Sequence, residues 1–126
     1  MTAQYPEDDE PLIPLPPLTE ASLRVAVNHL SLPNGVQFEG EMRTAWETAI
    51  QTSSLAPMHA FLRKWGVWVA INRYPARVAR LHECERIFAE SEERAARRAA
   101  TAEIGAMLRQ VEREIKNYVD VADPQA

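Results

Sequence analysis

A row of five large side chains near the C-terminus constrains the fold more than any other feature of this sequence. Its members follow one another at spacings of 4, 3, 4 and 3 residues: Ile104, Leu108, Val111, Ile115 and Tyr118. This spacing places them on one face of an α-helix, in the positions that pack against another helix. This row, which we call the C-terminal seam, therefore needs a partner, either within this chain or in another molecule.

The seam ends a long stretch, residues 76–119, that contains no proline and only one glycine, Gly105. As one unbroken helix this stretch would extend about 65 Å, which is longer than a domain of this size. Residues 91–102 are rich in Ala, Glu and Arg and contain no large apolar side chain. We therefore expect either a bend near residues 91–100 or a solvent-exposed bridge before the seam.

Proline and other turn-forming residues divide the preceding chain into further helices. Thr19 is a suitable N-cap for the first of these, which carries Leu23, Val27 and Leu30 on one face. Residues 31–35, Ser-Leu-Pro-Asn-Gly, are expected to form the turn before the second helix. The third helix is expected to begin with Ser54 as its N-cap. The second, third and fourth helices each have apolar positions that are expected to face the core of the bundle. These positions are Phe38, Met42, Ala45, Ala49, Met58, Phe61, Leu62, Trp65, Val69, Val78, Leu81, Cys84 and Phe88.

The resulting fold class is all-α: a small helical bundle of four or five helices with a long C-terminal amphipathic helix. Residues 1–18 hold five of the nine prolines and are expected to form a disordered, acidic, proline-rich tail. We expect the helical core to span residues 19–90 and a C-terminal helical extension to span 91–119. Residues 120–126 are expected to form a second disordered tail.

Composition excludes several classes of protein. The net charge of −4 gives no electrostatic reason to expect nucleic acid as the main partner. A membrane-spanning helix needs about 20 apolar residues, and no run of that length is present. The acidic N-terminal residues are the opposite of a secretory signal, and the single cysteine suits a reducing compartment. A cytoplasmic location is the expectation.

The residues that most often carry chemistry do not form a recognisable constellation. His82 and Glu85 have a helical spacing suited to a shared metal ion, but they supply only two ligands. Cys84 lies among apolar positions and is expected to pack as a small hydrophobic side chain. His29 and His59 fall on separate predicted helices. We therefore expect a protein that is not an enzyme and has no cofactor or metal site.

Several short strings of residues carry a family resemblance. The most specific combines Leu55, Pro57 and His59 with the Leu62–Trp65 turn that follows. The others are Leu15-Pro-Pro-Leu18, Leu32-Pro33, Phe38-Glu-Gly-Glu41 and Trp46-Glu-Thr-Ala49. On these residues, about 18–90 of the chain resembles a family of small uncharacterised actinobacterial proteins with a domain of unknown function. The resemblance implies a helical fold and an antitoxin-like role in a two-gene module, and it implies no catalytic residue. It also implies that the extension after residue 90 lies outside the family.

These observations favour a non-enzymatic helical module that binds a partner protein through the C-terminal seam, as an antitoxin-like regulator would. Partner binding is assigned to Ile104, Leu108, Val111, Ile115 and Tyr118. Self-association through the same helix is one alternative. A DNA-binding transcriptional regulator is another alternative. The sequence, however, does not show the helix-turn-helix pattern of two helices joined by a short glycine turn, with the second helix basic. Arg94, Arg97 and Arg98 could touch phosphate, but the glutamates beside them argue against that interpretation.

Overall fold

The computed structural model describes residues 10–122, with side chains as far as residue 116. Within this range the chain forms five α-helices and no strand, which confirms the all-α prediction. The helices are α1 (Glu20–Leu30), α2 (Leu32–Thr52), α3 (Ala56–Asn72), α4 (Pro75–Glu90) and α5 (Arg94–Ala122). None of the five is both long enough and apolar enough to cross a lipid bilayer.

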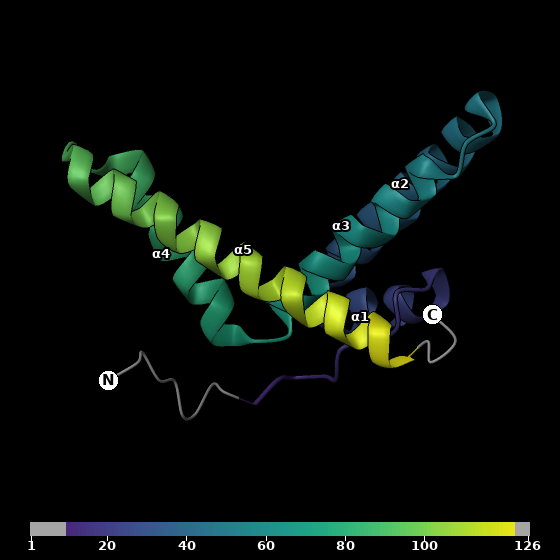
Figure 1. The fold of residues 1–126 in the computed structure, drawn as a ribbon, viewed down its shortest axis with the longest axis horizontal. Helices are drawn as coiled ribbons and strands as arrows, with labels where there is room; N and C mark the ends of the chain where they lie inside the picture. The colour runs from purple at the N-terminus through teal and green to yellow at the C-terminus, as the bar shows by residue number, and fades with distance from the viewer. Residues whose placement is uncertain (1–9, 123–126) are drawn as a thin grey trace.

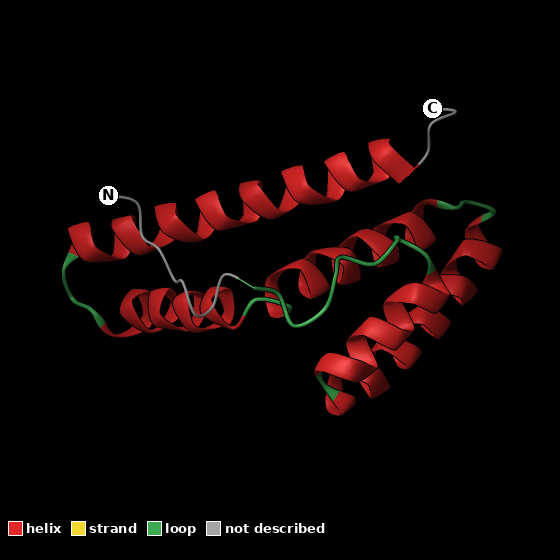
Figure 2. Cartoon of the chain, turned by 90° about the horizontal axis from the view of Figure 1, so that it is seen from below, coloured by secondary structure: helices red, strands yellow, loops and turns green. Residues whose placement is uncertain are grey.

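Two helical hairpins give the molecule its shape. Figure 1 shows α2 and α3 side by side in one hairpin and α4 and α5 side by side in the other, with α1 at the base of the first. Helix α3 belongs to both halves, because it packs against α1 and α2 and also against α4 and α5. Figure 2 shows α5 returning along α4 after a short loop.

The first of two apolar clusters fills the space between α1, α2 and α3. Its centre is aromatic: the ring of Phe38 lies 4.9 Å from that of Phe61 and 5.4 Å from that of Trp65. Trp65 is buried, and its indole N–H donates a hydrogen bond of 3.0 Å to Glu41. The other buried members are Leu23, Ala26, Val27 and Val69. Most of the predicted inward face of these helices is therefore confirmed.

The second cluster joins α3 to α5. Ala70 and Ile71 of α3 pack with Val111 and Ile115 of α5, and side chains of α4 cover them. The expected boundary at residue 90 therefore does not separate a core from an extension, because α5 completes the core. One prediction for α4 was wrong: Phe88 is 54% exposed and does not face inward.

The expected bend near residues 91–100 is found at residues 91–93, where α4 ends and α5 begins. The amide of Glu93 donates to the Ser91 hydroxyl in this loop, at 3.1 Å. α5 continues to Ala122, so residues 120–122 are helical and not part of a disordered tail. The remaining residues of that predicted tail, 123–126, lie outside the described range.

Two predicted helix starts also need correction. Residues 32–35 are not a turn, because α2 begins at Leu32 directly after its N-cap Ser31, with Pro33 in the first turn. A Cβ atom at Gly35 would lie 1.8 Å from Oδ1 of Asn28, so a larger residue there would force the Asn28 side chain to move. At the start of α3 the N-cap position is Leu55, and the Ser54 hydroxyl accepts a hydrogen bond of 3.1 Å from the amide of Ala56.

The segment before α1 is extended, as its prolines predict, but it is not an unpacked tail. The amide of Leu12 donates to the carbonyl of Arg73 at 2.7 Å. Ile13 packs on the first cluster, Leu15 on the second, and Leu18 on both. The expectation of disorder is therefore corrected for residues 10–18, while residues 1–9 lie outside the described range.

Candidate interaction surface

The C-terminal seam is divided between the interior and the surface. Val111 and Ile115 are 0% and 5% exposed and pack on α3, so their partner is within the chain. Ile104 is half-buried, and Leu108 is 41% exposed. The side chain of Tyr118 lies outside the described ones. Two of the five residues assigned to partner binding are therefore not available to another molecule.

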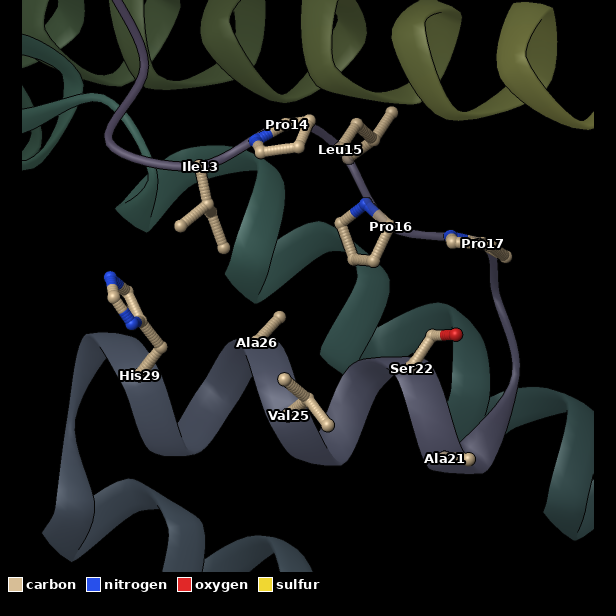
Figure 3. Close-up of a pocket in the computed structure, with 10 residues that line it drawn as sticks. All are labelled: Ile13, Pro14, Leu15, Pro16, Pro17, Ala21, Ser22, Val25, Ala26 and His29. Carbon is tan, nitrogen blue, oxygen red and sulfur yellow. The ribbon is translucent and has the colours of Figure 1, made fainter.

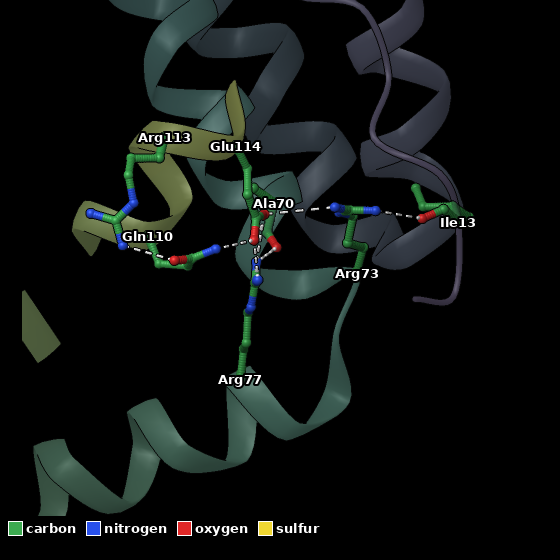
Figure 4. Close-up of polar contacts among 7 residues, drawn as sticks. All are labelled: Ile13, Ala70, Arg73, Arg77, Gln110, Arg113 and Glu114. Carbon is green, nitrogen blue, oxygen red and sulfur yellow. Dashed lines mark hydrogen bonds and ion pairs between the residues drawn. The ribbon is translucent and has the colours of Figure 1, made fainter. Parts of the chain in front are cut away.

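An ionic contact beside the second cluster fixes α5 in this position. Figure 4 shows Arg77 of α4 reaching Glu114 of α5. Its Nη1 donates to Oε1 of Glu114 at 3.0 Å and to the carbonyl of Ala70 at 2.9 Å, and its Nη2 donates to Oε2. Gln110 donates to the same carboxylate at 3.2 Å. A bidentate contact of this kind sets the position of α5 relative to α4.

Arg73 extends the contact toward the N-terminal segment. It is 8% exposed, lies 3.6 Å from Oε1 of Glu114 and donates a hydrogen bond of 3.4 Å to the carbonyl of Ile13. Its guanidinium also stacks on the ring of Tyr74, with 4.7 Å between Cζ and the ring centroid. Nε of Arg73 is buried without a hydrogen-bond partner among the described residues. The side chain therefore connects the N-terminal segment and α5 to the end of α3, which is a structural role.

The pKa of Glu114 reflects this environment. Burial raises the pKa of its carboxyl, but hydrogen bonds from Arg77 and Gln110, together with the charges of Arg77 and Arg73, outweigh burial. The pKa therefore lies below its ordinary value of 4.5. Glu114 is a carboxylate that stabilises the fold and is not poised to donate a proton at neutral pH.

A shallow apolar groove of about 650 Å³ lies between the N-terminal segment and α1. Figure 3 shows Ile13 and the prolines that follow it facing Val25, Ala26 and His29 of α1 across the groove. Val25 is 70% exposed, so the groove has an apolar floor that water reaches. It supplies few polar groups to orient a small molecule.

Among the described residues, four of the nine exposed large apolar side chains lie in a second row on α2. Besides the face that carries Phe38 into the core, α2 has six positions at spacings of 4, 3, 4, 3 and 4 that share an arc of about 80°. We call them the α2 row: Leu32, Val36, Glu39, Arg43, Trp46 and Ile50. Its four apolar members are 71%, 76%, 54% and 61% exposed, in chain order. Single exposed apolar residues are normal, but four on one helix face are typical of a contact surface.

Opposite charges occupy the centre of the α2 row. Glu39 accepts hydrogen bonds from Nε and Nη2 of Arg24 on α1, the latter at 3.1 Å. These hydrogen bonds hold the pKa of the Glu39 carboxyl below its ordinary value, and the positive charge of Arg43 adds to the effect. Arg43 itself is exposed and makes no hydrogen bond or ion pair with the side chains that the structure describes. The row is thus apolar at both ends and charged, with both signs, in the middle.

Sequence reasoning missed this row although its signal was present. The turn predicted at residues 31–35 excludes Leu32 from the second helix and leaves Val36 at the very start of that helix. Without those two positions, Trp46 and Ile50 are an isolated pair. The spacing becomes visible only when Ser31 is recognised as an N-cap followed by Pro33 in the first helical turn.

The helices that carry these surfaces coincide with a known family pattern. The sequence model of a family of unknown function, DUF6247, matches residues 16–117. The chain belongs to the DUF6247 family. The resemblance to an uncharacterised family is confirmed, but its limit at residue 90 is corrected. The DUF6247 match includes most of α5, so the seam is part of the family's domain and not an addition to it.

Comparisons with curated proteins and with solved structures find no match to this DUF6247 protein.

Among the described residues, no group of three or more His, Cys, Asp or Glu is placed to hold a metal ion. Cys84 is 1% exposed, and burial, followed by the charge of Glu103, raises the pKa of its thiol. A raised pKa and burial both oppose formation of a reactive thiolate.

A basic hollow of about 340 Å³ lies where α4 meets the start of α5 in this DUF6247 protein. Its lining consists of Phe88, Arg94, Arg97, Arg98 and Thr101. Glu90, on the adjacent turn, bonds instead to Arg86, at 3.3 Å. The hollow is open and its neighbours include three glutamates in residues 90–93, so it does not concentrate positive charge as a phosphate site does.

Proposed function

We propose that this DUF6247 protein is a non-enzymatic helical interaction module whose binding surface is the α2 row. One observation carries the proposal: α2 already packs one face against α1 and α3, yet it keeps a second, regularly spaced apolar row in solvent. Burial of such surface drives most protein association, at roughly 25 cal/mol per Å². The partner is a protein, and an antitoxin-like regulator would be one member of this class.

The internal position of Val111 and Ile115 supports moving the surface from α5 to α2. Truncating either residue would damage the core, whereas the ends of the α2 row project from the fold. Trp46 is the strongest single candidate, because tryptophan is enriched among residues that dominate binding energy at protein interfaces. Leu108 remains exposed on α5, but its seam neighbours in the same helix are turned inward.

The test compares two surfaces of similar exposure. A variant with Trp46→Ser and Ile50→Ser removes the C-terminal half of the α2 row. Val25→Ser is the matched control, because Val25 is 70% exposed but lies in the groove beside α1. Each chain, and the unchanged chain, is co-expressed with an untagged copy and with the proteins of its native host, and the material that co-purifies is identified by mass.

The proposal expects the unchanged chain and the Val25→Ser control to retain a bound protein that the double variant loses. Far-ultraviolet circular dichroism must show equal helix content in all three chains. Retention by the double variant and loss by Val25→Ser would place binding at the groove and would overturn the proposal for α2.

A further inference from the structure

The six positions of the α2 row are arranged symmetrically along the sequence. Its six positions are equally distant in sequence from residue 41: Leu32 and Ile50 lie nine residues away on either side, Val36 and Trp46 five, and Glu39 and Arg43 two. A second α2 laid antiparallel across the row therefore meets it in a matching order. Each large apolar side chain meets another, and each charge meets the opposite charge.

We propose that the α2 row is a two-fold symmetric interface that pairs with the α2 row of a second copy of this chain, antiparallel and centred on residue 41. This proposal rests on the α2 row being a binding surface and names its partner. A closed two-fold contact uses the same patch on both copies, which requires a patch complementary to itself. The order apolar, apolar, acidic, basic, apolar, apolar meets that requirement.

The spacing agrees with the geometry of antiparallel helix pairs. Spacings that alternate between 4 and 3 assign the row to the d and a positions of a heptad pattern. In an antiparallel pair every layer combines an a position of one helix with a d position of the other. Leu32 with Ile50, Val36 with Trp46, and Glu39 with Arg43 each form such a combination.

Charge excludes the parallel alternative. In a parallel pair each residue would face its own copy, so that Glu39 would meet Glu39 and Arg43 would meet Arg43 at the centre of the interface. Like charges placed opposite each other are destabilising. In the antiparallel pair the guanidinium of Arg43, which has no hydrogen-bond partner among the described side chains, meets the carboxylate of Glu39 from the second copy.

The local network can accept that contact. Glu39 is held in place by Arg24, which donates to both of its carboxylate oxygens, and its side chain remains 42% exposed. Arg24 is shared between Glu39 and Glu20. Two copies would bring together four acidic and four basic groups, which is a neutral set with each charge opposite its counter-charge.

The neighbouring helices leave the α2 row open to solvent. The four apolar members are more than half exposed although α1 and α3 flank the helix, so neither neighbour covers the row. The distance from Leu32 to Ile50 along the helix is about 27 Å, which gives five turns of contact.

The decisive experiment exchanges the central charges. Glu39→Lys alone puts four basic groups at the centre of a pair of identical chains, and Arg43→Glu alone puts four acidic groups there. Each variant is expected to show the mass of a single chain by light scattering at concentrations where the unchanged chain shows twice that mass. An equimolar mixture of the two variants places opposite charges together again and is expected to restore the double mass.

The matched control is Thr44→Lys, which adds a positive charge at an exposed position of α2 about a third of a turn away from the row. It is expected to keep the mass of the unchanged chain. Circular dichroism reports whether Glu39→Lys folds after losing its contact with Arg24.

Cross-linking gives a second measurement that keeps all central charges. A mixture of Val36→Cys and Trp46→Cys chains is expected to form a disulfide-linked dimer under mild oxidation, whereas either variant alone is not. The unchanged chain is the control for this measurement, because its one cysteine, Cys84, is buried and is expected to form no disulfide between chains.

The results separate the two proposals. A single-chain mass for the unchanged protein up to about millimolar concentration, or cross-linking of Val36→Cys with itself, overturns the symmetric pairing. If a single-chain protein still loses a different partner on Trp46→Ser and Ile50→Ser, the interaction surface stands and only the second copy is rejected. If changes in the row affect no association at all, both proposals are wrong.

Discussion

Arg77 of α4 donates to both carboxylate oxygens of Glu114 on α5, and this contact holds α5 against α4. Val111 and Ile115 of the same helix are buried against α3. The α5 helix, to which the sequence analysis assigned partner binding, is therefore part of the core. The exposed apolar row lies instead on α2.

Glu114→Gln is expected to destabilise the fold by about 1–3 kcal/mol, because it removes the charged acceptor from Arg77 and leaves a half-buried guanidinium without its counter-charge. Urea denaturation followed by circular dichroism measures the change. Glu112→Gln on the same helix is the control, since its partner Arg63 is 64% exposed. That control should change stability by less than about 1 kcal/mol.

Acid is expected to weaken the same contact. The pKa of Glu114 is lower in the folded chain than in the unfolded chain, so the unfolded chain binds more protons. The stabilisation is complete above the unfolded value near 4.5 and is lost as pH falls through the folded pKa. Glu39, Glu41 and Glu103 are shifted in the same direction, so the difference between the unchanged chain and Glu114→Gln is the informative quantity. That difference in unfolding free energy should shrink from pH 7 to pH 3. A difference independent of pH would contradict this role of Glu114.

The seam is expected to respond unevenly to truncation. Ile115→Ala removes a buried side chain and should cost about 2–5 kcal/mol. Leu108→Ala removes a side chain that is 41% exposed and should cost about 1 kcal/mol or less. Thermal denaturation of both variants provides the comparison. Equal costs would mean that the two positions share one environment, contrary to the structure.

Because the N-terminal segment packs on α3, the effect of Gly66→Ala on stability is expected to depend on Leu18. A Cβ atom at Gly66 would lie 2.5 Å from Cδ2 of Leu18. Gly66→Ala should therefore gain little or lose stability in the unchanged chain, although alanine is favoured over glycine in a helix by about 1 kcal/mol. In a Leu18→Ala background the clash is absent, and the same substitution should stabilise by about that amount.

Gly40→Ala is the control for this double-mutant cycle, because nothing lies within 4 Å of a Cβ atom there. It should stabilise α2 in either background. Additive effects of the changes at Gly66 and Leu18 would show that residues 10–18 do not pack on α3 in solution.

The sequence predicted helices well because apolar spacing is a local property. The inward positions Leu23, Val27, Phe38 and Trp65 follow directly from that spacing and are buried. Spacing does not say which element will cover a seam. Whether Val111 packs on α3 or on another molecule depends on the tight loop at residues 91–93 and on Arg77, neither of which helical periodicity reveals.

The prediction that the N-terminal segment is unpacked was wrong for a related reason. Its prolines correctly predict an extended backbone, but extended is not the same as unpacked. Leu15 and Leu18 were the signal, since apolar side chains beside prolines can fill a groove between helices without any regular structure of their own. The α2 row was missed because a proline in the first turn of a helix resembles a helix break.

Light scattering of three chains across a concentration series shows whether the contact surface lies on α2 or on α5. The unchanged chain and Leu108→Ser should both associate to twice the mass of one chain, while Trp46→Ser should stay at the mass of one chain. This pattern places the contact surface on α2. Association that survives Trp46→Ser and is lost in Leu108→Ser would place it on α5 and would contradict the account.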